Sequence, residues 1–181
     1  MTDRLAPDFQ PAKVVAVLNR HGVRYVLIGG LAAALNGSPS VTQDIDICHA
    51  NDDANLKALA GALREVHARL RGAPPEVPFR LDALTLARGD SFTFTTDIGW
   101  IDILATPAGT AGYEELAANA QRVEAFGETF LVASIDDLIR MKRAAGRPRD
   151  RAELEIMAGG VQESLESIDA WNAGPVFDPG N

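Results

Sequence analysis

Apolar and polar residues alternate along two short segments, and this alternation is the clearest structural signal in the chain. In residues 41–48, two isoleucines point to one side of a strand, and Asp44 and Asp46 point to the other. Residues 100–104 repeat the pattern, with Asp102 placed between two isoleucines. The pattern therefore predicts two half-buried strands, each with an apolar face and an acidic face.

Further elements follow from apolar spacing and from helix-ending residues. A short apolar run at residues 25–28 ends at a Gly-Gly pair and predicts a buried strand followed by a tight turn. Asp52 and Ser134 are typical residues for the start of a helix. We predict helices over residues 11–20, 31–35, 52–70, 111–120, 134–145 and 150–158, and further strands over residues 79–87, 92–96, 122–126 and 129–132.

The order of these elements indicates the fold class. Helices and strands alternate at first, and strands then cluster. This order predicts an α/β (α+β) fold with a mixed sheet, helices mainly on one side, and a short C-terminal helical segment. We expect one domain over residues 1–160 and a loosely ordered polar tail over residues 161–181.

Composition narrows the function classes. The formal net charge of −8 disfavours a general DNA-coating role, because an acidic surface repels phosphates. One cysteine, Cys48, allows no internal disulfide. The start of the chain has no apolar segment of the signal-peptide type, and no apolar run is long enough for a membrane span. We therefore expect a cytoplasmic protein.

The acidic faces of the two strands indicate a metal site. Asp44 and Asp46 lie two residues apart and can converge on one cation, which would relieve their mutual repulsion. If the two strands are neighbours, Asp102 joins the same cluster. Three carboxylates can hold two Mg²⁺ ions about 4 Å apart, which is the arrangement used for phosphoryl transfer.

A Gly-Gly pair precedes this cluster. Gly29 and Gly30 lie between a predicted strand and a predicted helix, where glycine lets the backbone approach a phosphate and the helix start offers free N–H groups. Thirteen residues, 31–43, separate Gly30 from Asp44. Each feature alone is weak, since an Asp-x-Asp can be a solvated strand edge and a Gly-Gly pair an ordinary turn. The joint order is what predicts a phosphate-binding turn followed by a metal site.

In this order the sequence resembles the polymerase-β-type nucleotidyltransferase superfamily. The stretch YVLIGGLAAALNGSPSVTQDIDI is similar to that family's strand, Gly-Gly and Asp-x-Asp signature. GWIDIL resembles the segment that carries the third carboxylate, and SIDDLIRMKRAAGRPRDRAELE resembles the closing helical segment of small bacterial members. These members include relatives of abortive-infection toxin nucleotidyltransferases. Minimal antitoxin-like members carry Gly-Ser and then an arginine, whereas this chain has Gly-Gly-Leu-Ala-Ala, as in toxin-like or antibiotic-modifying branches.

The resemblance implies transfer of a nucleoside monophosphate from an NTP, such as ATP, with release of pyrophosphate. It implies Mg²⁺, or Mn²⁺ in its place, held by Asp44, Asp46 and Asp102. Asp102 would also assist deprotonation of an attacking hydroxyl. Gly29 and Gly30 would contact the β- and γ-phosphates.

A basic segment at residues 140–151 adds a second expectation. Six basic residues and one acidic residue give it a charge of +5, which leaves −13 for the rest of the chain. Basic residues can simply complement a helix C-terminus. Lys142 and Arg147 also match recurring positions of the resembling segment, so we expect these two to contact the triphosphate or the acceptor.

The acceptor and the biological role stay open. The acceptor could be RNA such as tRNA, a protein or a small molecule. A toxin–antitoxin partner that keeps the fold as a binding module is one alternative, and an antibiotic nucleotidyltransferase is another. The three histidines, His21, His49 and His67, lack metal-ligand spacing, and we expect all three at the surface. Trp100 could stack on a base, although ordinary packing is the simpler expectation.

Overall fold

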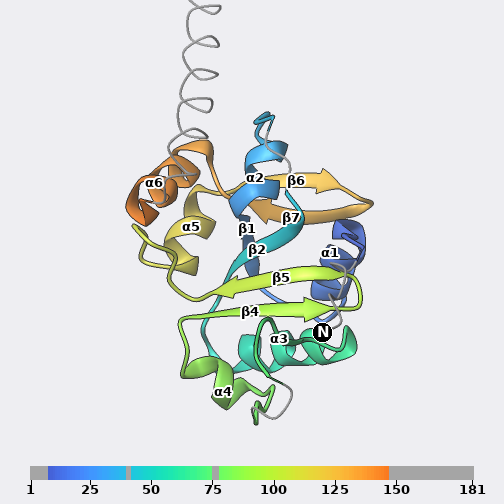
Figure 1. The fold of residues 1–181 in the computed structure, drawn as a ribbon. Helices are drawn as coiled ribbons and strands as arrows, with labels where there is room; N and C mark the ends of the chain where they lie inside the picture. Colours follow the sequence, from blue (N-terminus) through green and yellow to red (C-terminus); the bar gives the residue numbers. More distant parts are fainter. Residues whose placement is uncertain (1–7, 40–41, 75–77, 147–181) are drawn as a thin grey trace, which may run out of the picture.

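The structure is a computed structural model that describes residues 8–39, 42–74 and 78–146. Its centre is a seven-stranded mixed sheet in the order β3-β4-β5-β2-β1-β7-β6 (Figure 1). The strands are β1 (Tyr25–Ile28), β2 (Asp44–His49), β3 (Arg69–Leu70), β4 (Ser91–Thr96), β5 (Gly99–Leu104), β6 (Gln121–Ala125) and β7 (Glu128–Val132). The predicted α/β class with a mixed sheet is confirmed.

Two parallel pairings occupy the middle of the sheet. β2 runs parallel to β5, and β1 runs parallel to β7, whereas the other neighbours are antiparallel. The isoleucines of β2 and β5 are at most 2% exposed, so they form the core-facing side that the alternation predicts. The sheet register places the aspartates of both strands on the opposite side.

The helices lie against both faces of this sheet. They are α1 (Pro11–Arg20), α2 (Gly29–Leu35), α3 (Asp53–Glu65), α4 (Ala83–Ala87), α5 (Tyr113–Asn119) and α6 (Ile135–Ala145). α1 and α3 pack over the isoleucine side, where their apolar residues line a narrow space with Ile101. α5 and α6 lie on the other side of β1 from α1 (Figure 1). All four residues of β1 are buried, so this strand needs cover on both faces.

The predicted caps are present. The Asp52 side chain accepts a hydrogen bond from the Asn55 N–H at the start of α3, and the Ser134 side chain accepts one from the Asp137 N–H at the start of α6. α6 ends at Gly146, whose φ of 63° lies in the left-handed region. The predicted hairpin of residues 122–126 and 129–132 corresponds to β6 and β7.

Two predicted elements differ in the structure. The helix expected to reach residue 70 ends at Glu65, because His67 takes a positive φ of 52° and the chain then forms β3 beside β4. The strand expected over residues 79–87 is wrong: residues 79–82 form no strand, and residues 83–87 form α4. Asp82 starts this helix by accepting a hydrogen bond of 2.9 Å from the Thr85 N–H.

Several expectations concern residues outside the described ranges. The helix predicted over residues 150–158 and the tail predicted over residues 161–181 both lie there. Among the helices that the structure describes, none has the length and apolar character needed to cross a membrane.

The buried side chain of Asn55 joins α3 to the residues next to β1 and β2. Asn55, at the start of α3, is 4% exposed. It accepts a hydrogen bond of 2.7 Å from the Arg24 N–H and donates to the Arg24 and Ala50 carbonyl oxygens at 3.1 and 2.7 Å. Asn55 therefore fixes α3 against the start of β1 and the end of β2.

We expect Asn55→Ala to lower the free energy of unfolding by about 2 kcal/mol, because the buried Arg24 N–H loses this partner. For a chain of this size that corresponds to a fall in melting temperature of about 4–8 °C. A thermal melt followed by circular dichroism measures the change. Asn51→Ala, at an exposed position four residues earlier, is the control and should leave the melt unchanged. Equal melts for the two variants would contradict this role of Asn55.

Candidate functional site

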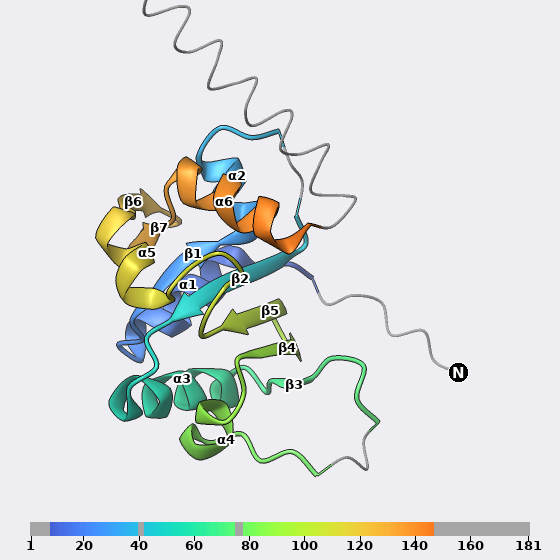
Figure 2. The ribbon, with the colours of Figure 1, turned by 90° about the vertical axis from the view of Figure 1, so that its left-hand side faces the viewer.

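Parallel pairing of β2 and β5 brings the predicted carboxylates together. Asp46 lies directly opposite Asp102 in the register, and Asp44 lies opposite Trp100 (β2 and β5 run side by side in Figures 1 and 2). Directly opposed residues of neighbouring strands point to the same face, and such strands lie about 4.8 Å apart. We call this side of the two strands the aspartate face. It carries Asp44, Asp46 and Asp102, as the alternation predicts.

Gly29 allows α2 to begin directly against Asp46. Its φ is 68°, and a Cβ atom at this position would lie 2.1 Å from the Asp46 Oδ2 atom. A side chain at residue 29 would therefore occupy the space of the carboxylate. The structure thus gives a reason for this glycine that the sequence does not reveal, namely room for an aspartate of the neighbouring strand.

Gly30 lies similarly close to Thr42, two residues before the start of β2. A Cβ atom at Gly30 would lie 2.8 Å from the Thr42 Cβ atom. The Thr42 hydroxyl in turn donates a hydrogen bond of 2.6 Å to Asp44 Oδ1. The Gly-Gly pair therefore lies against the residues that surround Asp44 and Asp46, which places the start of α2 beside the aspartate face.

Asp102 is paired with an arginine that the sequence analysis did not single out. The Arg71 Nη2 atom donates to both carboxylate oxygens of Asp102, at 2.9 and 2.8 Å. Arg71 follows the edge strand β3, and its N–H donates to the Thr93 carbonyl oxygen of β4. Its side chain thus reaches across β4 to β5. The helix predicted over residues 52–70 stops just before Arg71, and no local pattern links this arginine to a residue 31 positions away.

Burial and a like charge oppose the ionised form of Asp102. Burial raises the pKa of its carboxyl group, the Arg71 guanidinium lowers it, and the Asp44 charge raises it, with a net upward direction. Only 16% of the Asp102 side chain is exposed. A second positive charge near this group would offset both the burial and the repulsion from Asp44.

Trp100 provides a surface for the same arginine. The Arg71 guanidinium carbon lies 5.0 Å from the centre of the Trp100 ring, which is a cation–π distance. Trp100 is partly exposed and precedes Asp102 by two residues on β5. This contact holds Arg71 beside the aspartate face independently of its ion pair.

The three aspartate side chains have different neighbours in this structure. Asp44 accepts from Thr42, Asp46 lies against Gly29, and Asp102 accepts from Arg71. Accordingly, no group of three or more His, Cys, Asp or Glu side chains within the described ranges is arranged to hold a metal ion. The donor set itself fits Mg²⁺ or Mn²⁺, since all three are carboxylates on one face, and hard divalent cations prefer oxygen.

α6 carries the described part of the basic segment. α6 contacts α2, the helix that begins at Gly29, and Lys142 is partly buried near the end of α6. Arg140 has a structural role, because it pairs with Glu115 of α5 at 2.5 Å and with Asp137 at 2.7 Å. Arg147 lies outside the described residues.

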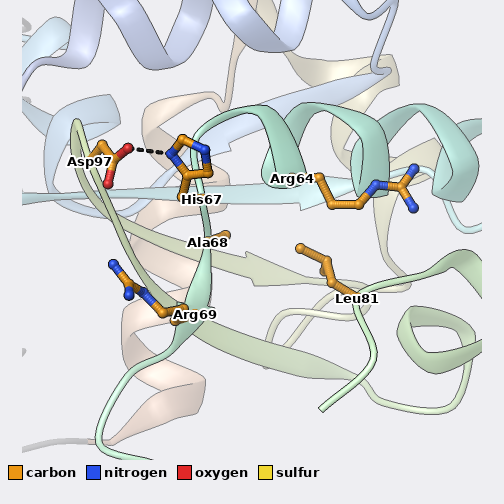
Figure 3. A pocket seen from close by; sticks show the side chains of 6 residues that line it. All are labelled: Arg64, His67, Ala68, Arg69, Leu81 and Asp97. Carbon is orange, nitrogen blue, oxygen red and sulfur yellow. Dashed lines mark hydrogen bonds and ion pairs between the residues drawn. The ribbon is translucent and has the colours of Figure 1, made fainter. Parts of the chain in front are cut away.

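A separate depression of about 410 Å³ lies where the chain passes from the end of α3 to β3 (Figure 3). Its lining consists of Arg64, His67, Ala68, Arg69, Leu81 and Asp97. His67 and Asp97 are joined by a contact of 2.5 Å, and both side chains are more than half exposed. None of the predicted site residues lines this depression.

The last two residues of β2 are buried. His49 is 2% exposed, so its expected surface position is wrong. It ends β2 next to Ala50, and burial lowers the pKa of its imidazole. Cys48 is a buried thiol that donates to the Ala105 carbonyl oxygen.

Comparison with known proteins gives a result at the level of fold. No protein-family model matches the sequence, and no curated protein matches it either. Among solved structures, the lincosamide antibiotic adenylyltransferase LnuA with bound lincomycin is similar, with a TM-score of 0.55 and 12% identity over 84% of this chain and 98% of LnuA.

Two other solved structures are also similar. A Thermotoga maritima protein provisionally assigned as a nucleotidyltransferase has a TM-score of 0.49 and 18% identity, over 92% of this chain and 96% of its own. The antibiotic-resistance factor ANT(2'')-Ia has a TM-score of 0.48 and 13% identity, over 89% of this chain and 94% of its own. The chain therefore has the fold of the nucleotidyltransferase LnuA, with the aspartate face on its two central parallel strands.

Proposed function

We propose that this protein is a nucleotidyltransferase that moves a nucleoside monophosphate from an NTP to a hydroxyl acceptor. The observation that carries the proposal is the alignment of Asp46 with Asp102 on parallel strands, directly beside the helix that begins at Gly29. The shared fold with LnuA, an adenylyltransferase, supports this reading and makes ATP the first NTP to test.

Asp44, Asp46 and Asp102 are the residues that would hold Mg²⁺ or Mn²⁺. Such a cation, when bound, supplies charge neutralisation for the triphosphate and lowers the pKa of a nearby hydroxyl. The Gly29 and Gly30 backbone lies against Asp46 and Thr42, so a triphosphate held there would be within reach of the same carboxylates.

The proposed reaction forms one bond and breaks one. The acceptor oxygen attacks the α-phosphorus, the bond from that phosphorus to the bridging oxygen breaks, and pyrophosphate leaves with the electron pair. We assign to Asp102, whose side chain is 16% exposed, assistance in removing the proton of the attacking hydroxyl.

The acceptor is proposed only as a class. A small molecule with a hydroxyl group takes first place, because LnuA, whose fold this chain shares, is an adenylyltransferase of lincosamide antibiotics. RNA and protein acceptors are the next to assay. A toxin–antitoxin role stays a prediction from the sequence resemblance.

We expect NTP binding that depends on Mg²⁺ and that Asp46→Asn abolishes. The substitution removes one carboxylate charge and leaves the isoleucine side of β2 intact, so the fold should persist. Isothermal titration calorimetry with ATP, with and without Mg²⁺, measures the binding.

Asp53→Asn is the matched control for this test. It makes the same change in charge at an exposed position of α3, where Asp53 forms an ion pair with Lys57 one turn later. This variant should bind ATP like the wild type. Equal ATP affinity with and without Mg²⁺ in the wild-type protein would sink the proposed role of the aspartates.

We expect Gly29→Ala to weaken Mg²⁺-dependent ATP binding by about tenfold or more, because the added methyl group would displace the Asp46 carboxylate. Gly37→Ala separates this effect from backbone strain. Gly37 also has a positive φ, of 90°, but within the described residues, its two chain neighbours aside, no atom lies within 4 Å of its added Cβ. Both variants should lose about 1 kcal/mol of stability from the left-handed backbone. Equal ATP affinities for the two variants would refute the clash with Asp46.

We expect Lys142→Ala to weaken ATP binding by about tenfold, because the variant loses one charge-assisted hydrogen bond to a phosphate. Arg143→Ala is the control, because Arg143 is the exposed basic neighbour in the same last turn of α6. If the two charges only complement the helix C-terminus, both variants should lose a few tenths of a kcal/mol and keep ATP affinity. Parallel titrations and thermal melts distinguish the two readings.

A further inference from the structure

Arg71 makes two contacts at the aspartate face at the same time. One is the ion pair with Asp102, and the other is the contact with the Trp100 ring. The ion pair engages only the Nη2 atom, which donates to both Asp102 oxygens. The other guanidinium N–H groups are therefore not used on this carboxylate, although an arginine can donate two parallel hydrogen bonds to one.

The ion pair and a divalent cation would need the same oxygen atoms. Both Asp102 oxygens accept from Arg71, so a cation that binds them competes with the guanidinium for the same oxygen atoms. The two positive charges would also repel each other at short range. The pair is shielded from solvent, with 28% of the Arg71 side chain and 16% of the Asp102 side chain exposed, so the competition should be measurable.

The Trp100 contact gives Arg71 a place to remain after displacement. It lies on the same strand as Asp102, on the same face, and it does not depend on the carboxylate. A guanidinium held over Trp100 would keep its full charge beside the site. A phosphate group is the partner that suits such a planar, permanently charged donor.

We propose that Arg71 is an exchangeable counter-ion, which holds Asp102 before a divalent cation binds and then transfers to a phosphate group of the NTP. This inference rests on the proposed function and deepens it, since it assigns a phosphate-binding arginine to the nucleotide site. Arg71 thereby couples cation binding to nucleotide binding at one carboxylate.

The proposal predicts that Arg71→Gln raises the affinity for Mn²⁺ and lowers the affinity for ATP. In the absence of nucleotide, Arg71→Gln should bind Mn²⁺ about threefold to tenfold more tightly than the wild type, because the competing charge is gone. In the presence of Mg²⁺, the same variant should bind ATP about tenfold more weakly, because a phosphate contact is lost. A residue that only supports the fold would not separate these two affinities.

The first experiment measures free Mn²⁺ by electron paramagnetic resonance during titration of the full chain without nucleotide. The second measures ATP affinity by calorimetry with Mg²⁺ present. Arg69→Gln is the matched control, because Arg69 carries the same charge two residues earlier and lines the separate depression of Figure 3. Arg71→Lys retains the charge and should keep Mn²⁺ affinity near that of the wild type. In an Asp102→Asn background, Arg71→Gln should no longer improve Mn²⁺ binding.

The outcomes separate this inference from the proposed function. If the wild type binds Mn²⁺ and ATP and Arg71→Gln binds both with unchanged affinity, the proposed role of Arg71 is overturned. The proposed nucleotidyltransferase function is not affected by that result. Weaker binding of both ligands by Arg71→Gln would also overturn it, because Arg71 would then merely support Asp102. If neither the wild type nor any variant bound Mn²⁺ or ATP, the proposed function and this inference would fall together. Tighter Mn²⁺ binding that Arg69→Gln reproduces would reduce the effect to net charge and overturn the exchange.

Discussion

The parallel pairing of β2 with β5 is the constraint on which the rest of the structure depends. Side chains alternate along each strand, so the register that opposes Asp46 to Asp102 also opposes Ile45 to Ile101. A shift of one residue would turn charged groups toward α1 and α3 and isoleucines toward the aspartate face. Burial of the isoleucines therefore holds the carboxylates in place, and the core and the candidate site are set by one register.

The three carboxylates on one face repel one another, and each of them has a different neighbour in the structure. Thr42 donates to Asp44, the start of α2 leaves room for the Asp46 carboxylate at Gly29, and Arg71 reaches Asp102 from beyond β4. The upward pKa shift of Asp102 indicates that burial and the Asp44 charge outweigh the arginine. A further positive charge beside Asp102 would offset the burial and the Asp44 charge.

Helices on the two sides of the sheet have different tasks. α1 and α3 cover the isoleucine side and complete the core, whereas α2 and α6 lie on the side that carries the proposed chemistry. The hydrogen bonds of Asn55 and the ion pairs of Arg140 fix helices to their neighbours, so these polar groups serve the fold. Arg71 and Trp100 differ from them, because both remain partly exposed beside the aspartate face.

The sequence by itself determined the features that arise from local periodicity and capping. Alternation predicted the strands and the side on which the three aspartates lie, and Asp52 and Ser134 predicted two helix starts. It did not predict β3, which follows a positive φ at His67, or α4, which begins with a cap at Asp82. It also did not predict the burial of His49, which depends on the packing around the end of β2. Only the tertiary structure decided that Gly29 makes room for Asp46 and that Arg71 pairs with Asp102. Contacts of this kind join residues that are far apart in the chain, and no local pattern of apolar and polar residues encodes them.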